Sequence, residues 1–206
     1  MNRCVIIAGA DINNYENAKK YLKDGDFIIC CDCGLRHLQK LNVKPNLIVG
    51  DFDSHKNPHL PVETIVLPCE KDDTDTGFAV KEALKRGAND FLFLGVIGNR
   101  FDHSFANISI LLMLDTLGKS ALAIDDFSEL QIISSQKAFI SDEFSFFSLL
   151  NVSGTAEGIS IKNAKYPLEN AIIKSEDQYG ISNQVLPNQI AEVSIQKGRL
   201  LLIRVK

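Results

Sequence analysis

No apolar run in this 206-residue sequence approaches the roughly 20 residues that a membrane-spanning helix needs. The N-terminal stretch MNRCVIIAGADINNYENAKK contains a short apolar segment. It lacks the longer apolar core and the small-residue cleavage site of a signal peptide. We therefore expect a cytoplasmic protein that has no membrane among its partners.

An excess of positive charge is also missing. The formal net charge is -4 at pH 7, which argues against a protein that binds nucleic acid by bulk attraction to phosphate. We expect a polyanionic ligand to be bound instead by local devices, such as metal ions, backbone N–H groups and a few Arg or Lys side chains. Nucleic acid is therefore not an expected partner.

Two common nucleotide-binding motifs are absent. Neither the P-loop pattern GxxxxGK[ST] nor the dinucleotide pattern GxGxxG occurs in the sequence. These absences exclude an ordinary P-loop kinase and an ordinary Rossmann dehydrogenase. Any nucleotide site in this chain must be built from other residues.

The sequence has 5 cysteines, and Cys30, Cys31 and Cys33 crowd into one strand-like run. A zinc site is weakly supported because no second Cys/His pair lies at ligand spacing. We interpret the cluster as small buried hydrophobic residues, which is how free cysteines usually pack.

Strand and helix signals alternate over residues 1–126. Continuous apolar runs predict strands, and periodic segments that end at Gly or Pro predict helices. The predicted strands are 3–9, 27–32, 47–54, 64–68, 90–98 and 120–126, and the predicted helices are 13–25, 34–43, 74–87 and 102–119. Such strands separated by helices indicate an α/β domain with a mostly parallel sheet that is covered on both faces.

Residues 127–206 differ in character. They consist of short alternating or apolar pieces broken by Gly, Asn, Pro and Ser, with no convincing helix. That pattern predicts an all-β sandwich, so we place a domain boundary between residues 126 and 127. Roughly 80 residues are few for a free-standing domain, so we expect it to pack against the first domain or another subunit.

Charged and polar side chains follow the predicted strands of the first domain. They are Asp32, then Asp51 and Asp53, then Asp72, Asp73 and Asp75, then Arg100, Asp102 and His103. The carboxyl ends of parallel strands lie along one rim, where such folds bind ligands, so we expect these side chains to converge on one cleft. In an extended chain Asp51 and Asp53 point to the same side, and Asp72 and Asp75 share a face at the mouth of a helix.

Converging carboxylates need a compensating positive charge, because desolvated like charges repel. A hard divalent cation supplies it, and Mg²⁺ prefers oxygen ligands from one or two carboxylates together with substrate phosphates. The turn GVIGNR, residues 95–100, offers backbone N–H groups, and Arg100 is a planar donor suited to phosphate oxygens. This combination predicts a nucleoside triphosphate bound with Mg²⁺.

A simpler interpretation stays open for each residue taken singly. Asp is common after strands because it suits turns and helix caps, so Asp73 or Asp75 can simply cap the helix that follows. His103 can equally be a core histidine at a helix start. His37, His55 and His59 have no patterned partners, and we expect them to lie on the surface.

Five motifs together resemble the thiamine pyrophosphokinase family. They are DCGL at residues 32–35, GDFDS at 50–54, DDTD at 72–75, GNRFDH at 98–103 and GISN at 180–183. Their order and spacing span nearly the whole chain, and GDFDS with DDTD is the specific pair. The sequence departs from the family where Cys33 and Asn99 replace usual glycines close to the expected phosphate path.

The resemblance implies an enzyme that transfers the intact pyrophosphoryl group of ATP to the hydroxyl of thiamine, releasing AMP. It implies an α/β catalytic domain over residues 1–126 that binds nucleotide and metal, and a β-sandwich over residues 127–206 that binds thiamine. It also implies a homodimer in which both subunits line each active site.

The resemblance also implies roles for individual residues. Mg²⁺ would be held by Asp51, Asp53 and Asp75, which with Asp102 form the expected catalytic set. Asp102 or one of the other clustered aspartates is the candidate for orienting the thiamine hydroxyl or its aminopyrimidine. The expected nucleotide-binding residues are Asp32, Asp72, Asp73, Thr74, Asn99, Arg100 and His103, and the expected thiamine-binding residues are Ser182 and Asn183.

Two other functions remain compatible with the residues themselves. One is a metal-dependent phosphohydrolase that uses the same acidic rim with water as the nucleophile. The other is a non-enzymatic module that senses a nucleotide through the first domain and binds a partner through the second.

Overall fold

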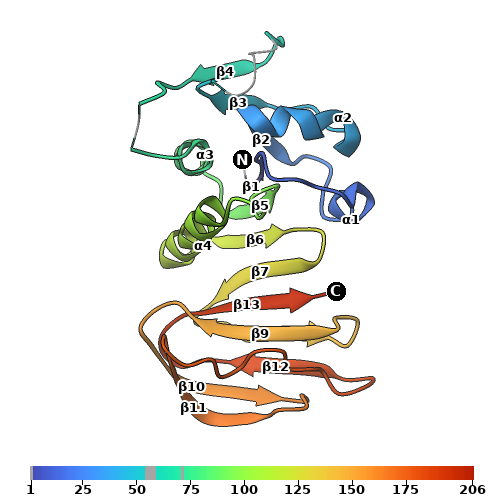
Figure 1. Cartoon of the computed structure of the whole chain (residues 1–206), viewed down its shortest axis with the longest axis vertical. Coiled ribbons are helices and arrows are strands. Elements are labelled where there is room, and N and C mark those ends of the chain that lie inside the picture. Colours follow the sequence, from blue (N-terminus) through green and yellow to red (C-terminus); the bar gives the residue numbers. More distant parts are fainter. Residues whose placement is uncertain (1, 54–58, 71) are drawn as a thin grey trace. The chain divides into compact units, whose positions relative to one another are not determined.

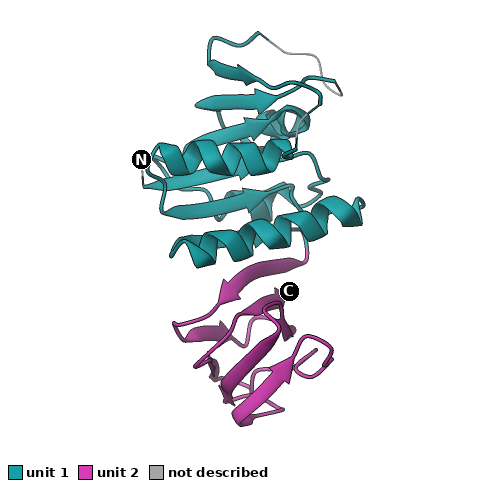
Figure 2. Cartoon of the chain, turned by 90° about the vertical axis from the view of Figure 1, so that its left-hand side faces the viewer, with its two compact units in different colours: residues 1–126 teal, residues 127–206 magenta. Residues whose placement is uncertain are grey.

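The computed structural model describes residues 2–53, 59–70 and 72–206. The chain divides into two compact units, Met1–Asp126 and Phe127–Lys206 (Figure 2). The division falls where the alternation of strand and helix signals ends in the sequence. His55 and Ser54 lie outside the described residues.

Unit 1 contains a parallel sheet. Its strands are β1 (Arg3–Ile7), β2 (Phe27–Cys31), β3 (Leu47–Gly50), β4 (Glu63–Val66), β5 (Asp90–Leu94) and β6 (Ser120–Ile124). They are hydrogen-bonded in the order β4-β3-β2-β1-β5-β6, and each of these pairs is parallel. The predicted strands are therefore confirmed. Each strand ends a few residues before its predicted end, where the polar loop begins.

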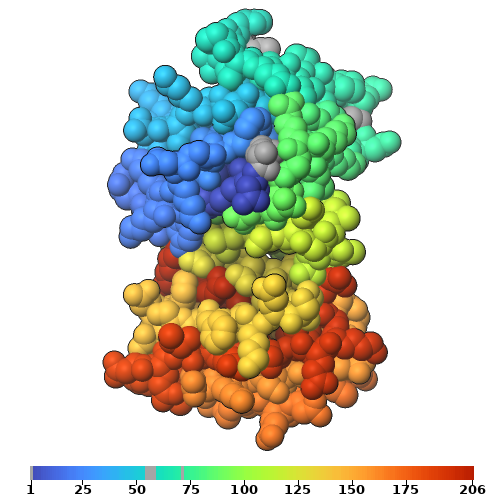
Figure 3. Space-filling model, turned by 180° about the vertical axis from the view of Figure 1, so that it is seen from behind, coloured from blue at the N-terminus to red at the C-terminus, as the bar shows by residue number. Residues whose placement is uncertain are grey.

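Helices cover both faces of this sheet. They are α1 (Tyr15–Lys19), the 3₁₀ helix η1 (Asp32–His37), α2 (Leu38–Leu41), α3 (Asp75–Lys85) and α4 (Phe101–Thr116). Helices α3 and α4 lie on one face, and α1 and α2 lie on the other (Figure 1). The segments of α3 and α4 border each other on the surface drawn in Figure 3. Among the described residues, no helix is both long and apolar enough to span a membrane.

The central strand β1 shows why apolar and polar residues do not alternate in the strands of this sheet. Its residues Val5 and Ile7 pack into the core beneath α1 and α2 and are fully buried. Its residues Cys4 and Ile6 point to the opposite face and are fully buried as well. Both faces of the strand are therefore apolar, as a sheet covered by two helical layers requires.

Side-chain caps fix where two helices begin. Asn14 accepts a hydrogen bond from the backbone N–H of Asn17 at 3.0 Å and starts α1. Thr74 accepts one from Gly77 at 3.0 Å and starts α3. Thr74, rather than Asp73 or Asp75, is therefore the cap of α3.

Helix α1 is shorter than the predicted helix 13–25, which is wrong in its second half. The guanidinium of Arg3 on β1 donates to the carbonyl of Tyr21 at 2.8 Å and to the carboxylate of Asp26 at 2.8 Å. These contacts hold the chain after Lys19 in turns close to the sheet, where the helix cannot continue. A tertiary contact therefore overrides the local preference for helix.

Unit 2 is built from strands in two antiparallel sheets. The strands are β7 (Ser128–Ile133), β8 (Ala138–Ser141), β9 (Phe146–Asn151), β10 (Thr155–Lys162), β11 (Leu168–Lys174), β12 (Ile190–Ser194) and β13 (Leu200–Val205). Strand β13 pairs with β7 and β9, and the other sheet has the order β11-β10-β12-β8. One core, with Phe147, Ile161 and Leu202 among its members, is shared by both sheets. The predicted β-sandwich is confirmed.

The packing of α4 yields a stability prediction. Leu114 on α4 is fully buried, whereas Leu117 at its end is 52% exposed. Leu114→Ala should lower the free energy of unfolding by about 2–5 kcal/mol, because it leaves a cavity under the helix. Leu117→Ala should change it by no more than about 0.5 kcal/mol. Urea unfolding followed by circular dichroism measures both, and equal losses would contradict this packing.

Candidate active site

A cleft of about 620 Å³ lies within unit 1. Its walls are the segments that follow β1, β2, β3 and β5 and the segment that leads into α3. Strands β1 and β5 are neighbours although β2, β3 and β4 come between them in sequence, so the strand order reverses at this point. Open α/β sheets bind ligands at the carboxyl ends of the strands beside such a reversal.

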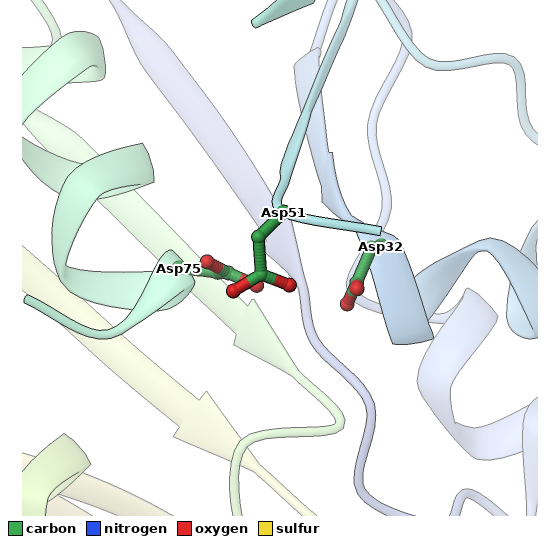
Figure 4. A group of neighbouring side chains, drawn as sticks. All are labelled: Asp32, Asp51 and Asp75. Atoms are coloured by element: carbon green, nitrogen blue, oxygen red, sulfur yellow. The ribbon is translucent and has the colours of Figure 1, made fainter. Parts of the chain in front are cut away.

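Three carboxylates meet in this cleft. One oxygen from each of Asp32, Asp51 and Asp75 lies within 4.8 Å of the other two. Figure 4 shows the three side chains turned toward a common space, with Asp51 between the other two. Asp32 begins η1, Asp51 follows β3, and Asp75 is the first residue of α3. The predicted convergence of strand ends is what brings them together.

The glycine that precedes Asp51 permits this approach. A Cβ atom on Gly50 would lie 2.5 Å from the Cβ of Asp32, which is too close for real atoms. A side chain at residue 50 would therefore push β3 away from η1 and separate Asp32 from Asp51. The glycine of the GDFDS motif thus lets Asp32 and Asp51 approach each other within the acidic group, which we define as Asp32, Asp51 and Asp75.

The backbone of the GDFDS motif differs from the expectation. Phe52 has a φ of 56°, in the left-handed region, so residues 51–53 are not an extended chain. The backbone N–H of Asp53 lies 3.3 Å from the Asp51 carboxylate, and the Asp53 side chain is exposed. The expectation of an extended chain from Asp51 to Asp53 is therefore wrong. Asp53 still borders the cleft.

The DDTD motif divides among several roles. Asp75 joins the acidic group, and Thr74 caps α3. Asp73 lines the cleft and forms an ion pair with Lys81 at 2.5 Å. Asp72 is exposed and precedes the cap, so it lies outside α3 and does not share a helix face with Asp75 as expected.

The turn after β5 carries an exposed ion pair. Arg100 donates from Nη2 to Asp102 at 2.6 Å and from Nε at 3.2 Å. The hydrogen bond from Arg100, followed by smaller contributions, lowers the pKa of Asp102 to about 2. Arg100 borders the cleft together with Asn99 and His103, and His103 is exposed rather than part of the core.

Buried polar side chains behind this turn hold it in place. The hydroxyl of Ser104 accepts a hydrogen bond from the Gly98 N–H at 3.0 Å and lies 3.1 Å from the Gly98 carbonyl. The amide of Asn107 donates to the carbonyl of Val96 at 2.7 Å. The main chain of the predicted phosphate-binding turn is therefore fixed by α4.

The sequence interpretation missed one wall of the cleft. Residues 8–11, AGAD, follow β1 and line the cleft. Arg36 of η1 also borders it and forms an ion pair with Asp11 at 2.8 Å. The rule that located the acidic residues, a polar loop directly after a buried strand, applies equally to this loop and would have found it.

The cysteine cluster is buried as predicted for Cys30 and Cys31, and burial raises the pKa of both thiols. Cys33 is half-buried and borders the cleft. His59 is exposed, as expected. The expectation of a surface position for His37 is wrong, because only 2% of that residue is exposed.

In unit 2, Asn183 is only 2% exposed and its amide is engaged with main chain. Its Oδ1 accepts from the N–H of Tyr166 at 3.0 Å and of Gln184 at 2.9 Å, and its Nδ2 donates to the Tyr166 carbonyl at 2.7 Å. Ser182 is exposed, has a φ of 56°, and donates its N–H to the Ser148 hydroxyl at 3.0 Å. The two residues of the GISN motif thus have different surroundings.

The chain resembles several known proteins. It is 26% identical to the thiamine pyrophosphokinase of Bacillus subtilis (strain 168) over 207 residues, covering 97% of this chain and 96% of that relative. The crystal structure of the Bacillus subtilis thiamine pyrophosphokinase has a TM-score of 0.88 at 24% identity, covering 100% of this chain and 99% of that one. The thiamin pyrophosphokinase from Candida albicans has a TM-score of 0.75 at 18% identity, with 100% and 89% covered.

Family models match both units of the chain. Residues 18–122 match the catalytic domain of thiamin pyrophosphokinase. Residues 132–200 match the vitamin B1 binding domain of thiamin pyrophosphokinase. The chain therefore belongs to the thiamine pyrophosphokinase family.

Proposed function

We propose that the cleft of unit 1 binds ATP with Mg²⁺ and that the chain transfers the pyrophosphoryl group of ATP to the hydroxyl of thiamine. The products are thiamine diphosphate and AMP. The observation that carries this proposal is the group formed by Asp32, Asp51 and Asp75 in a cleft at the reversal of the strand order. Phosphoryl transfer depends mostly on positioning and on neutralising charge, which such a site supplies.

The donor set fits a hard cation. All three groups offer carboxylate oxygens, which Mg²⁺ prefers over nitrogen or sulfur. Asp51 and Asp75 would hold the ion together with Asp32, and Asp53 at the edge of the cleft stays a predicted ligand. When bound, Mg²⁺ neutralises charge on the phosphate oxygens of ATP.

Arg100 has donors left for phosphate. Its Nε and Nη2 donate to Asp102, and its Nη1 makes no hydrogen bond to the part of the chain that the structure describes. A guanidinium carries five N–H donors, so Asp102 fixes the plane of the group while the remaining N–H groups can reach a ligand. We therefore assign Arg100 to the phosphates, and Asp102 first to the orientation of Arg100.

Thiamine binding falls to the GISN segment of unit 2. Ser182 has an exposed hydroxyl that can donate and accept a hydrogen bond. Asn183 instead holds the main chain of Tyr166, a residue that is 58% exposed. A homodimer and a cytoplasmic location remain predictions of this proposal.

The first test measures the reaction itself. Incubation with Mg-ATP and thiamine should give AMP and thiamine diphosphate in equal amounts. Asp51→Asn should reduce this turnover roughly 10²–10³-fold, the usual loss when one preorganised charged group is removed from an active site. Asp24→Asn, which removes an exposed carboxylate that does not border the cleft, should keep nearly full activity.

The same assay separates the competing functions. Phosphate release without thiamine would indicate a phosphohydrolase, and ATP binding without any turnover would indicate a nucleotide sensor. Either result contradicts the proposed transfer. The Mg²⁺ concentration at half-maximal rate, compared between Asp32→Asn and Asp53→Asn, identifies which of these carboxylates completes the metal site.

Replacement of Arg100 tests the phosphate contact. Arg100→Lys keeps the charge but loses the fork geometry, so the KM for ATP should rise about tenfold. The matched control is Arg86→Lys, because Arg86 pairs with Glu63 and Glu82 at the far end of α3. The control should leave the KM for ATP unchanged, and steady-state kinetics compares the two. Unchanged kinetics in Arg100→Lys would place Arg100 away from the phosphates.

The two polar residues of the GISN motif should respond differently. Ser182→Ala should raise the KM for thiamine about tenfold, the cost of roughly one hydrogen bond to a ligand, with little change in the thermal midpoint. Asn183→Ala should lower the free energy of unfolding by about 2–4 kcal/mol, because main-chain groups of Tyr166 and Gln184 lose their partner. Kinetics with varied thiamine and thermal unfolding decide, and identical behaviour of the two variants would contradict this division.

A further inference from the structure

His37 packs behind the loop that follows β1. Its Nε2 lies 2.9 Å from the carbonyl oxygen of Ala10, and its Nδ1 lies 2.7 Å from the hydroxyl of Tyr15. A carbonyl can only accept a hydrogen bond, so the proton sits on Nε2, and Nδ1 accepts from the Tyr15 hydroxyl. Burial lowers the pKa of His37, which favours this neutral form.

Arg36 approaches the same nitrogen of His37 from a second direction. Its Nε lies 3.3 Å from Nε2, where two N–H groups would face each other, so this longer contact is not a hydrogen bond in the tautomer set by the 2.9 Å contact of Nε2 with the Ala10 carbonyl. The Arg36 guanidinium donates to the carbonyl of Gly9 and to the carboxylate of Asp11, the latter at 2.8 Å. Arg36 and His37 therefore hold three successive residues of the loop.

The opposite side of the loop is bound to β5. The Ala8 N–H donates to the Leu94 carbonyl at 2.9 Å, and the Ala10 N–H donates to the Gly95 carbonyl at 2.8 Å. A Cβ atom on Gly98 would lie 2.7 Å from the Cβ of Ala10, so the turn after β5 rests directly on this loop. A shift of Ala10 would therefore move the turn that carries Arg100.

His37 is also linked to the acidic group. The 3₁₀ helix η1 begins at Asp32 and ends at His37, so one short element carries a carboxylate of the acidic group and the support of the loop. His37 itself is not among the described residues that line the cleft. It can act on a ligand only through the residues it holds.

We propose that His37 is a positioning residue for ATP, which acts by holding the main chain of Ala10 at the floor of the cleft through its Nε2–H group. This inference rests on the proposed function, because it takes ATP as the ligand of the cleft. Loss of the hydrogen bond frees the Gly9–Asp11 segment and the turn that rests on it. Binding of ATP weakens, while thiamine, whose predicted contact at Ser182 lies in unit 2, binds as before.

The test compares three variants with the parent protein. His37→Ala removes the donor, and His37→Gln restores an N–H group at nearly the position of Nε2. Leu41→Ala is the matched control, because Leu41 of α2 is as buried as His37, at 2% exposed, but has no polar side-chain atom that could bind the Ala10 carbonyl. The KM values, kcat and the dissociation constant of Mg-ATP from calorimetry are measured below all thermal midpoints.

We expect His37→Ala to raise the KM and the dissociation constant for ATP about tenfold, with kcat and the KM for thiamine within about twofold of the parent. His37→Gln should recover most of the affinity. Leu41→Ala should lose stability without losing affinity. Equal losses of ATP affinity in His37→Ala and Leu41→Ala, or none in His37→Ala, would overturn the proposal.

Failure of the proposed function would look different. If the parent binds Mg-ATP but forms no thiamine diphosphate, the transfer reaction is wrong, and the calorimetric comparison still decides the role of His37. If the parent does not bind Mg-ATP, both proposals fail together.

Discussion

Mutual repulsion among Asp32, Asp51 and Asp75 is the constraint around which unit 1 is organised. Two unit charges at about 4 Å repel by roughly 1 kcal/mol in water and roughly 4 kcal/mol at the effective dielectric constant near a protein surface. The chain keeps three such groups within 4.8 Å by attaching each to the end of a rigid element. A bound cation would attract all three carboxylates. The framework that prevents the carboxylates from moving apart is therefore what would form the metal site.

That framework is rigid because the strands beneath it are buried on both faces and because its loops touch through main chain. Gly50 lets β3 approach Asp32, and Gly98 lets the turn before Arg100 rest on Ala10. At both places a Cβ atom on the glycine would collide with the Cβ of the neighbouring residue, so a side chain there would push the two segments apart. The approach of the carboxylates and the place of the predicted phosphate-binding turn therefore both depend on a glycine.

The sequence predicts much of this arrangement, because continuous apolar runs locate the buried strands and parallel pairing places their polar ends along one edge. It does not predict the details that depend on single backbone angles or distant contacts. The turn of the backbone between Asp51 and Asp53 follows from the positive φ of Phe52, and the early end of α1 follows from the contacts of Arg3 with Tyr21 and Asp26. Neither feature leaves a periodic signal, so pattern reading fails there.

For the same reason, the sequence does not tell whether a polar residue of a motif binds a ligand or supports the fold. The hydrogen-bond partners of the residue in the structure separate the two roles. Asn183 and His37 are both buried, and each polar side-chain atom of both makes a hydrogen bond to a neighbouring residue, which indicates that they position other groups. Ser182 is exposed, and Arg100 keeps N–H groups beyond those bound to Asp102. A side chain whose bonding capacity is already used holds the site together, and one with capacity remaining is available to a substrate. Residue type alone does not separate these roles, because the difference lies in the partners that the fold provides.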